Sequence, residues 1–157
     1  MIKEWYFSEG NQLCHFRVAG LLIRNNKLFV QKDKDNVCAL PGGHVDFGET
    51  SATTLVREFK EEIGVDVIVN RLVWVEEHFW KWGDKNAHQI HFYHLVSLKN
   101  DEDIPDDFIE TMHDNKDVSL QWLALDQLKS VEIYPDFLPE KICHIGDGVE
   151  HFIRNKW

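Results

Sequence analysis

The stretch that decides the fold is GHVDFGETSATTLVREFKEEIGV, residues 43–65, which predicts one amphipathic helix at about residues 51–63. Thr50 or Ser51 can cap its start, since either hydroxyl accepts a hydrogen bond from a free backbone N–H. Gly64 supplies the stop, because glycine readily adopts the left-handed conformation that ends many helices. Apolar side chains recur at helical spacing and predict one buried face. They are Ala52, Leu55, Val56, Phe59 and Ile63.

Three carboxylates crowd the end of this helix. Glu58 lies three residues before Glu61 and four before Glu62, a spacing that places like charges next to each other. Their repulsion costs about 0.2–0.5 kcal/mol per pair, and the negative end of the helix dipole adds to that cost. Both penalties change sign when a cation binds, and carboxylate oxygens suit Mg²⁺ or Mn²⁺. A solvated acidic helix face fits the same residues, so the helix alone leaves both interpretations open.

Arg57 and Glu49 lie close to these acids in the sequence. Arg57 stands four residues before Glu61 and can pair with it. Glu49 precedes the helix and can reach back to Arg57 across the tight loop from Gly43 to Gly48. Ordinary surface ion pairs have the same spacing, so these two residues support a built site without deciding for it.

Nine positions in this stretch hold a fixed spacing: Gly43, Glu49, Arg57, Glu58, Phe59, Glu61, Glu62, Gly64 and Val65. This pattern resembles the box of the Nudix hydrolases without a departure, and Leu40-Pro41-Gly42 resembles its usual lead-in. The resemblance implies an α/β fold, an α/β/α sandwich with a mixed β-sheet. Its general layout covers residues 5–130.

The resemblance also implies a role for each matching residue. Glu58 and Glu62 would ligate a divalent metal, and Glu61 would be a further ligand or the base that takes a proton from water. Arg57 would orient the glutamates with the help of Glu49. The implied reaction is attack by water on a pyrophosphate bond in a nucleoside diphosphate derivative, with Mg²⁺ or alternatively Mn²⁺ as cofactor.

Other parts of the box region carry smaller implied roles. Gly42, Gly43 and Gly48 would shape the loop that leads into the helix, with the first two near the substrate. Many family members use another acid in a loop before a strand that contains Trp. Before Trp122 of this chain the candidates are Glu110, Asp114 and Asp117.

Composition limits the class of protein. A chain of 157 residues predicts a single domain, 1–157, with a sizeable core. The net charge of −10 argues against a general nucleic-acid binder, and it means that a polyphosphate substrate needs the metal. We see no secretory leader, no apolar run long enough for a membrane span and no paired cysteine motif among three cysteines. The expectation is a cytoplasmic protein with free thiols.

Hydrophobic patterning predicts a strand-rich chain around the helix. Turns are expected at Asn25-Asn26 and Gly83-Asp84, and charged loops at 32–36 and 100–107. The stretch 65–82 is long enough to need a bulge or a bend. Strands are predicted at 15–23, 27–31, 38–40, 65–82, 87–98 and 120–123, with short helical segments at 126–129 and 139–145.

Three further groups of residues carry open alternatives. Trp80 and Trp82 fit either a platform for a nucleobase or ordinary core and interface packing. Arg17, on the first long strand, fits a phosphate contact or a plain salt bridge. A zinc site at His88, His91 and His94 is disfavoured, because in a strand the middle histidine faces away from the other two.

The sequence therefore predicts a metal-dependent hydrolase that acts on a small nucleotide, with nucleoside triphosphates and nucleotide sugars as the most open substrates. The alternatives are a nucleotide-binding module that does not catalyse and a structural cation-binding domain. Neither a nucleic-acid polymer nor a membrane is expected as a partner, and the spare aromatic residues are compatible with a homodimer.

Overall fold

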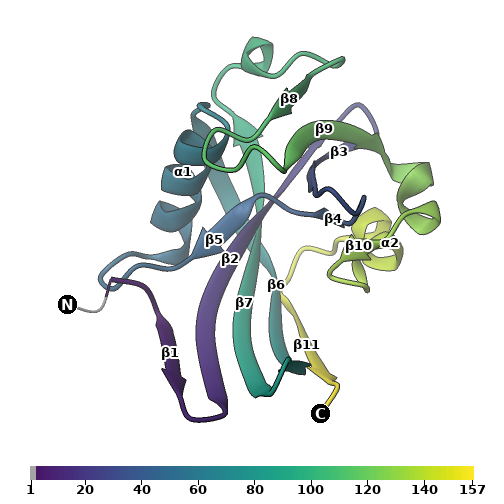
Figure 1. Cartoon of the computed structure of the whole chain (residues 1–157). Helices are drawn as coiled ribbons and strands as arrows, with labels where there is room; N and C mark the ends of the chain where they lie inside the picture. Colours follow the sequence, from purple (N-terminus) through teal and green to yellow (C-terminus); the bar gives the residue numbers. More distant parts are fainter. Residues whose placement is uncertain (1–2) are drawn as a thin grey trace.

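The computed structural model describes residues 3–157 and shows a twisted, mixed sheet with few helices (Figure 1). The two α-helices are α1 (Ser51–Glu62) and α2 (Leu138–Lys141). Short 3-10 turns occupy Asp101–Asp103, Leu125–Ser130 and Ile142–His144. The strands are β1 (Tyr6–Glu9), β2 (Gln12–Arg24), β3 (Lys27–Lys32), β4 (Cys38–Ala39), β5 (Gly42–His44), β6 (Val67–Trp82), β7 (Lys85–Leu98), β8 (Ile109–Thr111), β9 (Ser119–Ala124), β10 (Ile133–Tyr134) and β11 (Glu150–Asn155).

The sheet mixes parallel and antiparallel pairs. Its main path runs β10-β4-β3-β2-β7-β6-β11, while β1, β5, β8 and β9 pair alongside. β6 and β7 form a long antiparallel hairpin, whereas β2 with β7 and β11 with β6 run parallel. The α/β class and the mixed sheet predicted from the sequence are therefore confirmed.

Two hydrophobic cores lie on opposite faces of the sheet. Neighbouring residues of β2 belong to different cores, because successive side chains of a strand point to opposite faces. Val18 packs with Leu55 and Phe59 under α1. Ala19 packs with the cluster that contains Leu128 and Leu138, near the C-terminal helical turns. In Figure 1, α1 and α2 accordingly flank the sheet on opposite sides.

Helix α1 begins and ends as the sequence predicts. The hydroxyl of Thr50 accepts a hydrogen bond from the backbone N–H of Thr53 at 3.1 Å. Gly64 follows the helix with a φ of +84°, and its N–H bonds back to the carbonyl of Phe59 at 3.1 Å. The predicted buried face is wrong in one place, because Val56 is exposed.

Glu62 is buried while Val56 is exposed, so the acidic side of the helix faces further inward than the apolar stripe indicates. The loop after β8 joins this end of the helix, since the backbone N–H of His113 bonds to the carbonyl of Glu62 at 2.9 Å. A long-range contact of this kind leaves no periodic signal in the helix itself.

Several strands have no counterpart in the sequence prediction. The missed strands are β1, β5, β8, β10 and β11. Gly42 and Gly43, expected in a loop, form β5 and pair with Ala19 and Val18 of β2. The predicted C-terminal helix at 139–145 is shorter than expected, because α2 gives way to a 3-10 turn at Ile142.

The predicted turns and the irregular long strand are confirmed. Asn25 and Asn26 both have positive φ, of 51° and 57°, as a tight hairpin turn requires. β6 contains two register shifts against β7, between Val69 and Arg71 and between Leu72 and Trp74. These shifts bend the hairpin.

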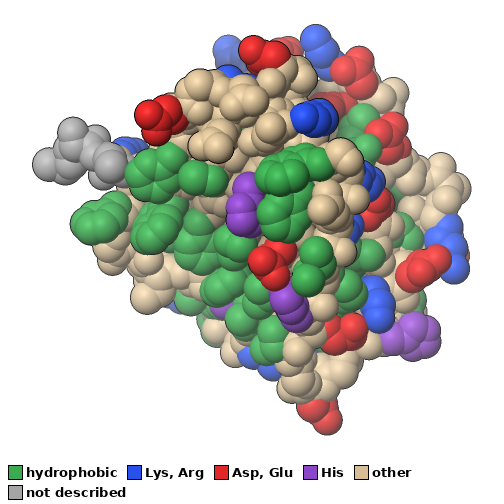
Figure 2. Space-filling view, turned by 90° about the horizontal axis from the view of Figure 1, so that it is seen from below, with side chains coloured by type: hydrophobic (Ala, Val, Ile, Leu, Met, Phe, Trp, Pro, Cys, Tyr) green, Lys and Arg blue, Asp and Glu red, His purple; other side chains and the backbone are tan. Residues whose placement is uncertain are grey.

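One stretch of the surface is strongly apolar. Trp5, Phe7, Phe16, Ile90 and Phe92 line a groove of about 300 Å³ beside β1. Figure 2, seen from below, shows hydrophobic side chains gathered on that end of the molecule. The expected homodimer stays a prediction.

The three cysteines, Cys14, Cys38 and Cys143, are free thiols. Within residues 3–157, none of the helices has the length and apolar character that crossing a membrane requires.

Candidate active site

Arg57 is the centre of a hydrogen-bonded group of acids on α1. Its Nε donates to Oε1 of Glu49 at 3.0 Å, and its Nη2 donates to Oε2 of the same carboxylate at 3.0 Å. Its Nη1 donates to Glu58 at 2.8 Å and to Glu61 at 3.2 Å. One guanidinium thus fixes three of the carboxylates that the sequence singles out, in the planar, fork-like geometry that arginine provides.

The charges of this group support each other. The hydrogen bond from Arg57 holds the pKa of Glu49 below its usual value, and the hydroxyl of Thr54, which donates to Glu49 at 2.8 Å, acts in the same direction. The same hydrogen bond raises the pKa of Arg57. Glu49 and Arg57 therefore form a stable ionised pair, on which the position of Glu58 depends.

Glu62 is the unusual member of the cluster. Its residue surface is only 8% exposed, and its Oε2 has no hydrogen-bond partner. Burial raises the pKa of Glu62 to about 8, with further contributions from the negative charges of Glu58 and Asp114. Burial likewise raises the pKa of Glu58. A buried carboxylate with one unpaired oxygen is costly, and a cation would supply the partner that this oxygen lacks.

The two glycines before the box bring the backbone close to the acids. A Cβ on Gly43 would lie 2.3 Å from Oε1 of Glu58, and one on Gly42 would lie 2.0 Å from the carbonyl oxygen of Val18. At Gly42 the obstacle is backbone, so no side chain fits; at Gly43 it is the end of the Glu58 side chain, which would have to move. The Glu58 carboxylate therefore packs directly against the backbone of β5, and larger residues would displace it.

These residues fit a divalent cation by their chemistry. Glu58 and Glu62 offer oxygen donors four residues apart on one helix, and the free Oε2 of Glu62 is the atom that most needs a positive partner. Among residues 3–157, however, no three His, Cys, Asp or Glu side chains already converge as a metal site. Water molecules and substrate oxygens would complete the coordination, as is usual for Mg²⁺.

The loop between β8 and β9 brings one of the three candidate acids to the site. Asp114 follows His113, whose backbone is bonded to the end of α1, and its charge acts on Glu62. Glu110 is exposed on β8, and Asp117 is exposed in the turn before β9. Asp114 is thus the best placed to assist the helix glutamates.

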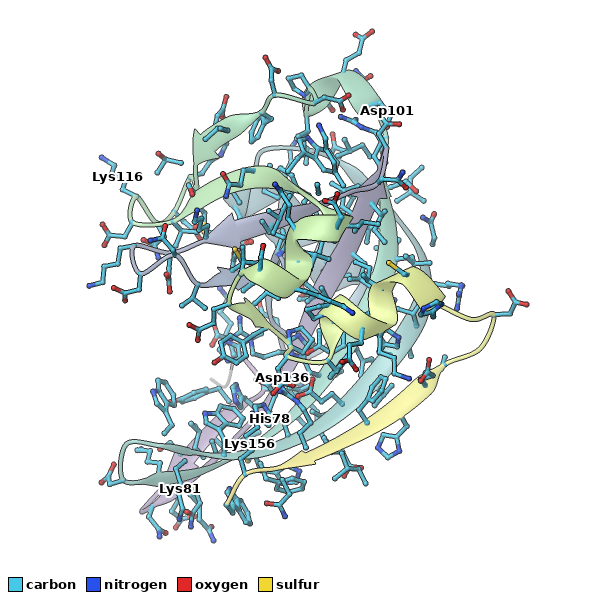
Figure 3. All side chains as sticks on the ribbon, turned by 90° about the vertical axis from the view of Figure 1, so that its right-hand side faces the viewer. His78, Lys81, Asp101, Lys116, Asp136 and Lys156 are labelled. Carbon is cyan, nitrogen blue, oxygen red and sulfur yellow. The ribbon has the colours of Figure 1, made fainter. Side chains whose placement is uncertain are left out.

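A cavity of about 630 Å³ lies near Arg17, whose guanidinium interacts with Glu58 and Glu62. No Asp or Glu lines it, although the chain carries 27 acidic residues. Figure 3 shows His78 and Lys156 side by side at this part of the molecule, with Lys81 nearer the end of the hairpin. The lining residues are Arg17, Ala19, Gln31, Ala39, Leu40, His78, Trp80, Lys81, Gln89, His91, Tyr93, Tyr134, Pro135, Arg154 and Lys156.

The inner wall of the cavity carries unsatisfied polar atoms. Nε of Arg17, Nε2 of His78 and Nε2 of His91 are buried without hydrogen-bond partners. Burial lowers the pKa of His78 to about 4 and that of His91 well below its usual value, so both rings are neutral at pH 7. These nitrogens are therefore available to a ligand without competition from protein partners.

Only one of the two predicted stacking residues reaches the cavity. Trp80 lines it and stacks on His78, with ring centroids 4.5 Å apart. Trp82 lies at the exposed end of β6 and is not part of the cavity wall.

The three histidines of β7 have different neighbours and do not face the same side of the sheet. His88 stacks on Phe79, and His94 bonds to Ser51 at 2.9 Å. His91 faces the cavity on the other side of the sheet, as strand alternation predicts.

The cavity also uses residues that the sequence analysis missed. Lys81, Tyr134, Arg154 and Lys156 come from segments without a motif. Arg154 on β11 and Lys156 just after it are two residues apart, the spacing that places two side chains on one face of an extended segment.

Comparison with known proteins agrees with this geometry. The family model of the NUDIX domain matches residues 15–141. An RNA pyrophosphohydrolase of Campylobacter jejuni is 34% identical over 111 residues, covering 65% of this chain and 69% of that protein. An ADP-ribose pyrophosphatase of Methanocaldococcus jannaschii is 42% identical over 62 residues, covering 37% of each.

Solved structures share the fold. The crystal structure of a NUDIX hydrolase from Nitrosomonas europaea superimposes with a TM-score of 0.65 at 17% identity, covering 90% of this chain and 79% of that one. The fold and the acidic helix define an α/β protein with a candidate cation site. With the domain match over most of its length, the chain belongs to the NUDIX family. Its matches span less than half the length of two curated relatives, at 43% and 37%.

Proposed function

We propose that this protein is a divalent-metal-dependent hydrolase of a pyrophosphate bond in a nucleoside diphosphate derivative. The observation that carries the proposal is the Glu62 carboxylate, which is buried beside Glu58 with one oxygen unpaired. A cation explains why this arrangement exists, whereas a solvated acidic face does not, because Glu62 is not solvated. Both named relatives in the comparison are pyrophosphate-cleaving enzymes by name, which supports the reaction class.

Each residue of the cluster has a role in this proposal. Glu58 and Glu62 hold the metal, and Arg57 with Glu49 keeps Glu58 in place. When bound, Mg²⁺ or Mn²⁺ neutralises diphosphate oxygens and lowers the pKa of an attacking water. Glu61, whose side chain is 56% exposed, is accessible to that water and accepts its proton. The new P–O bond forms as the bond to the departing phosphate group breaks.

The cavity beside Arg17 is the proposed substrate site. Its cationic side chains and neutral histidines suit phosphate oxygens, and Trp80 offers an aromatic surface to the base or sugar. Arg17 is best placed for the phosphates next to the metal, since it interacts with Glu58 and Glu62. Asp114 is the proposed assisting acid at the other side of Glu62.

The test is a panel of substrates with Mg²⁺ or Mn²⁺ and with chelator. The panel contains ADP-ribose, a 5′-triphosphorylated RNA, nucleoside triphosphates and nucleotide sugars, and chromatography identifies the products. We expect turnover of at least one class that chelator abolishes and that Glu62→Gln lowers by more than 100-fold. The matched control is Glu102→Gln, an exposed acid in a distant 3-10 turn, which should retain wild-type turnover. Tight binding without turnover would indicate a binding module instead, and wild-type turnover by Glu62→Gln would refute the metal assignment.

A further inference from the structure

Strand β11 lies beyond residues 15–141, the part that the NUDIX domain model matches, yet it forms one wall of the cavity. It pairs in parallel with β6 along its whole length, and the pairing continues as the N–H of Lys156 bonds to the carbonyl of Phe79 at 2.7 Å. The indole N–H of Trp157 then bonds to the carbonyl of Trp80 at 3.2 Å. Residues 156 and 157 are therefore fixed beside Trp80 of the cavity.

Arg154 anchors β11 to the rest of the sheet. Its Nε and Nη2 donate to the fully buried Glu76 at 2.9 and 2.6 Å, and the hydroxyl of Tyr93 donates to the other oxygen of Glu76 at 2.8 Å. Its Nη1 donates to Asp136 at 2.6 Å. Arg154 has its donors committed to protein carboxylates, so its main role is to hold the strand.

Lys156 is more exposed than Arg154 and has fewer protein partners. Its side chain is 54% exposed, and its Nζ has one carboxylate partner, Asp136, at 2.9 Å. Asp136 also accepts from Arg154, so it does not depend on the lysine. An exposed pair of this kind contributes little to stability, and a ligand anion can take the place of Asp136 at small cost. Figure 3 shows Asp136, His78 and Lys156 together.

The register of the sheet separates Lys156 from Arg17. Arg17 pairs with His91, which pairs with Glu76, so Arg17 is level with Glu76 on β6. Arg154 is level with His78, and Lys156 lies two residues further on. The two cations thus lie about four strand residues apart in level, roughly 13 Å at about 3.3 Å per residue. A pyrophosphate held near Arg17 leaves Lys156 for a different group of the substrate.

We propose that Lys156 is a specificity-determining residue that binds a second phosphate of the substrate, carried on the ribose away from the pyrophosphate. This inference rests on the proposed function, because it places the pyrophosphate between Arg17 and the glutamates. The absence of any lining carboxylate favours an anion over a neutral sugar at this end. A phosphomonoester on a ribose hydroxyl and the phosphodiester of a short RNA offer the same chemistry.

The experiment compares three substrates that share one reactive end: ATP, ATP with a 3′-phosphate, and the dinucleotide pppApA. We expect wild type to prefer one or both of the phosphorylated forms, mainly through a lower KM. Lys156→Gln should lose about tenfold of that preference, as expected for one charge-assisted hydrogen bond, measured as the ratio of kcat/KM for the phosphorylated form to kcat/KM for ATP. Lys156→Arg should keep the preference. The monoester and diester arms show which source of the phosphate is used.

The matched control is Lys141→Gln. Lys141 is 40% exposed and pairs with Glu150 of β11 at 3.1 Å, but it does not line the cavity. The Lys141→Gln substitution removes the same charge and a contact to the same strand. If Lys156 had only a structural role, both substitutions would change the substrate preference equally. Equal effects, or no wild-type preference for a second phosphate, would overturn the proposal.

Binding measurements keep this test separate from hydrolysis. Calorimetry compares adenosine 3′,5′-bisphosphate with AMP for wild type and Lys156→Gln. If no substrate is turned over, yet wild type binds the bisphosphate about tenfold more tightly and Lys156→Gln does not, the hydrolase proposal fails and the role of Lys156 stands. Equal affinities for both ligands in wild type would refute that role.

Discussion

Replacing Glu62 with Gln should stabilise the metal-free protein while abolishing its activity. The folded state keeps the pKa of this buried carboxyl at about 8, whereas its ordinary value is 4.5. At pH 7 the unfolded chain ionises Glu62 freely and the folded chain does not, which costs the folded state about 3 kcal/mol. Gln is similar in size and carries no charge, so the cost disappears.

The sign of this effect depends on pH. A carboxyl whose pKa is raised by folding costs nothing below about pH 4.5, and its cost grows until the pH exceeds about 8. Glu62→Gln should therefore match wild type near pH 4 and exceed it increasingly up to pH 8. For a domain of this size, about 3 kcal/mol corresponds to roughly 6–12 °C in Tm.

Thermal unfolding in chelator at several pH values measures the effect. Glu61→Gln is the matched control, because this neighbouring side chain is more than half exposed, and its Tm should change little. Adding Mg²⁺ should raise the Tm of wild type and not that of Glu62→Gln. A Tm for Glu62→Gln in chelator at pH 7 to 8 that is equal to or below wild type would refute the assignment of a costly buried carboxylate.

Three further substitutions test the surrounding structure. Arg57→Lys cannot make the forked contacts to the carboxylates and should lower kcat about 10–100-fold with a native circular dichroism spectrum; an unchanged kcat would contradict the bracing role. Gly43→Ala places a Cβ 2.3 Å from Glu58 and should lower metal affinity in calorimetry, and wild-type affinity would show that the acid moves freely. Arg154→Met leaves the buried Glu76 without its cationic partner, keeping only the hydrogen bond from Tyr93, and should destabilise the fold by about 3–5 kcal/mol in urea unfolding; a loss below about 1 kcal/mol would refute the importance of the pair.

The box helix and its acids were predictable because their signals are local. Caps, stop and the Arg57 contacts depend on residues within one short stretch, and periodicity fixes their relative positions. The burial of Glu62 was not predictable, since its surroundings come from distant parts of the chain: Gly42 and Arg17 before the helix and Asp114 after β8. Val56 is exposed because the same orientation of the helix that buries Glu62 turns Val56 toward the solvent.

The cavity could not be predicted from the sequence, for a different reason. Each strand that lines it shows the alternation of side chains, as with Arg17 and Ala19 or Arg154 and Lys156. Alternation shows which side chains of a strand share a face, but which face lines the cavity is known only once the strand order is known. The parallel pairing of β11 with β6 is not preceded by a hairpin turn, so no sequence motif predicts it. The sequence thus gives the parts of the wall and not their assembly, and Trp80 reaches the cavity while Trp82 does not.

Arg17 links the acidic helix to the cavity through charge balance. Burial lowers its pKa, and the carboxyl groups of Glu62 and Glu58 oppose that effect to the extent that they are ionised. A divalent cation held by the same acids would add positive charge next to Arg17, whose buried Nε has no hydrogen-bond partner. The oxygens of a diphosphate would satisfy both cations at once. Metal and substrate should therefore bind with positive cooperativity, and Arg17→Met should lower the affinity for a nucleotide more in the presence of Mg²⁺ than in its absence.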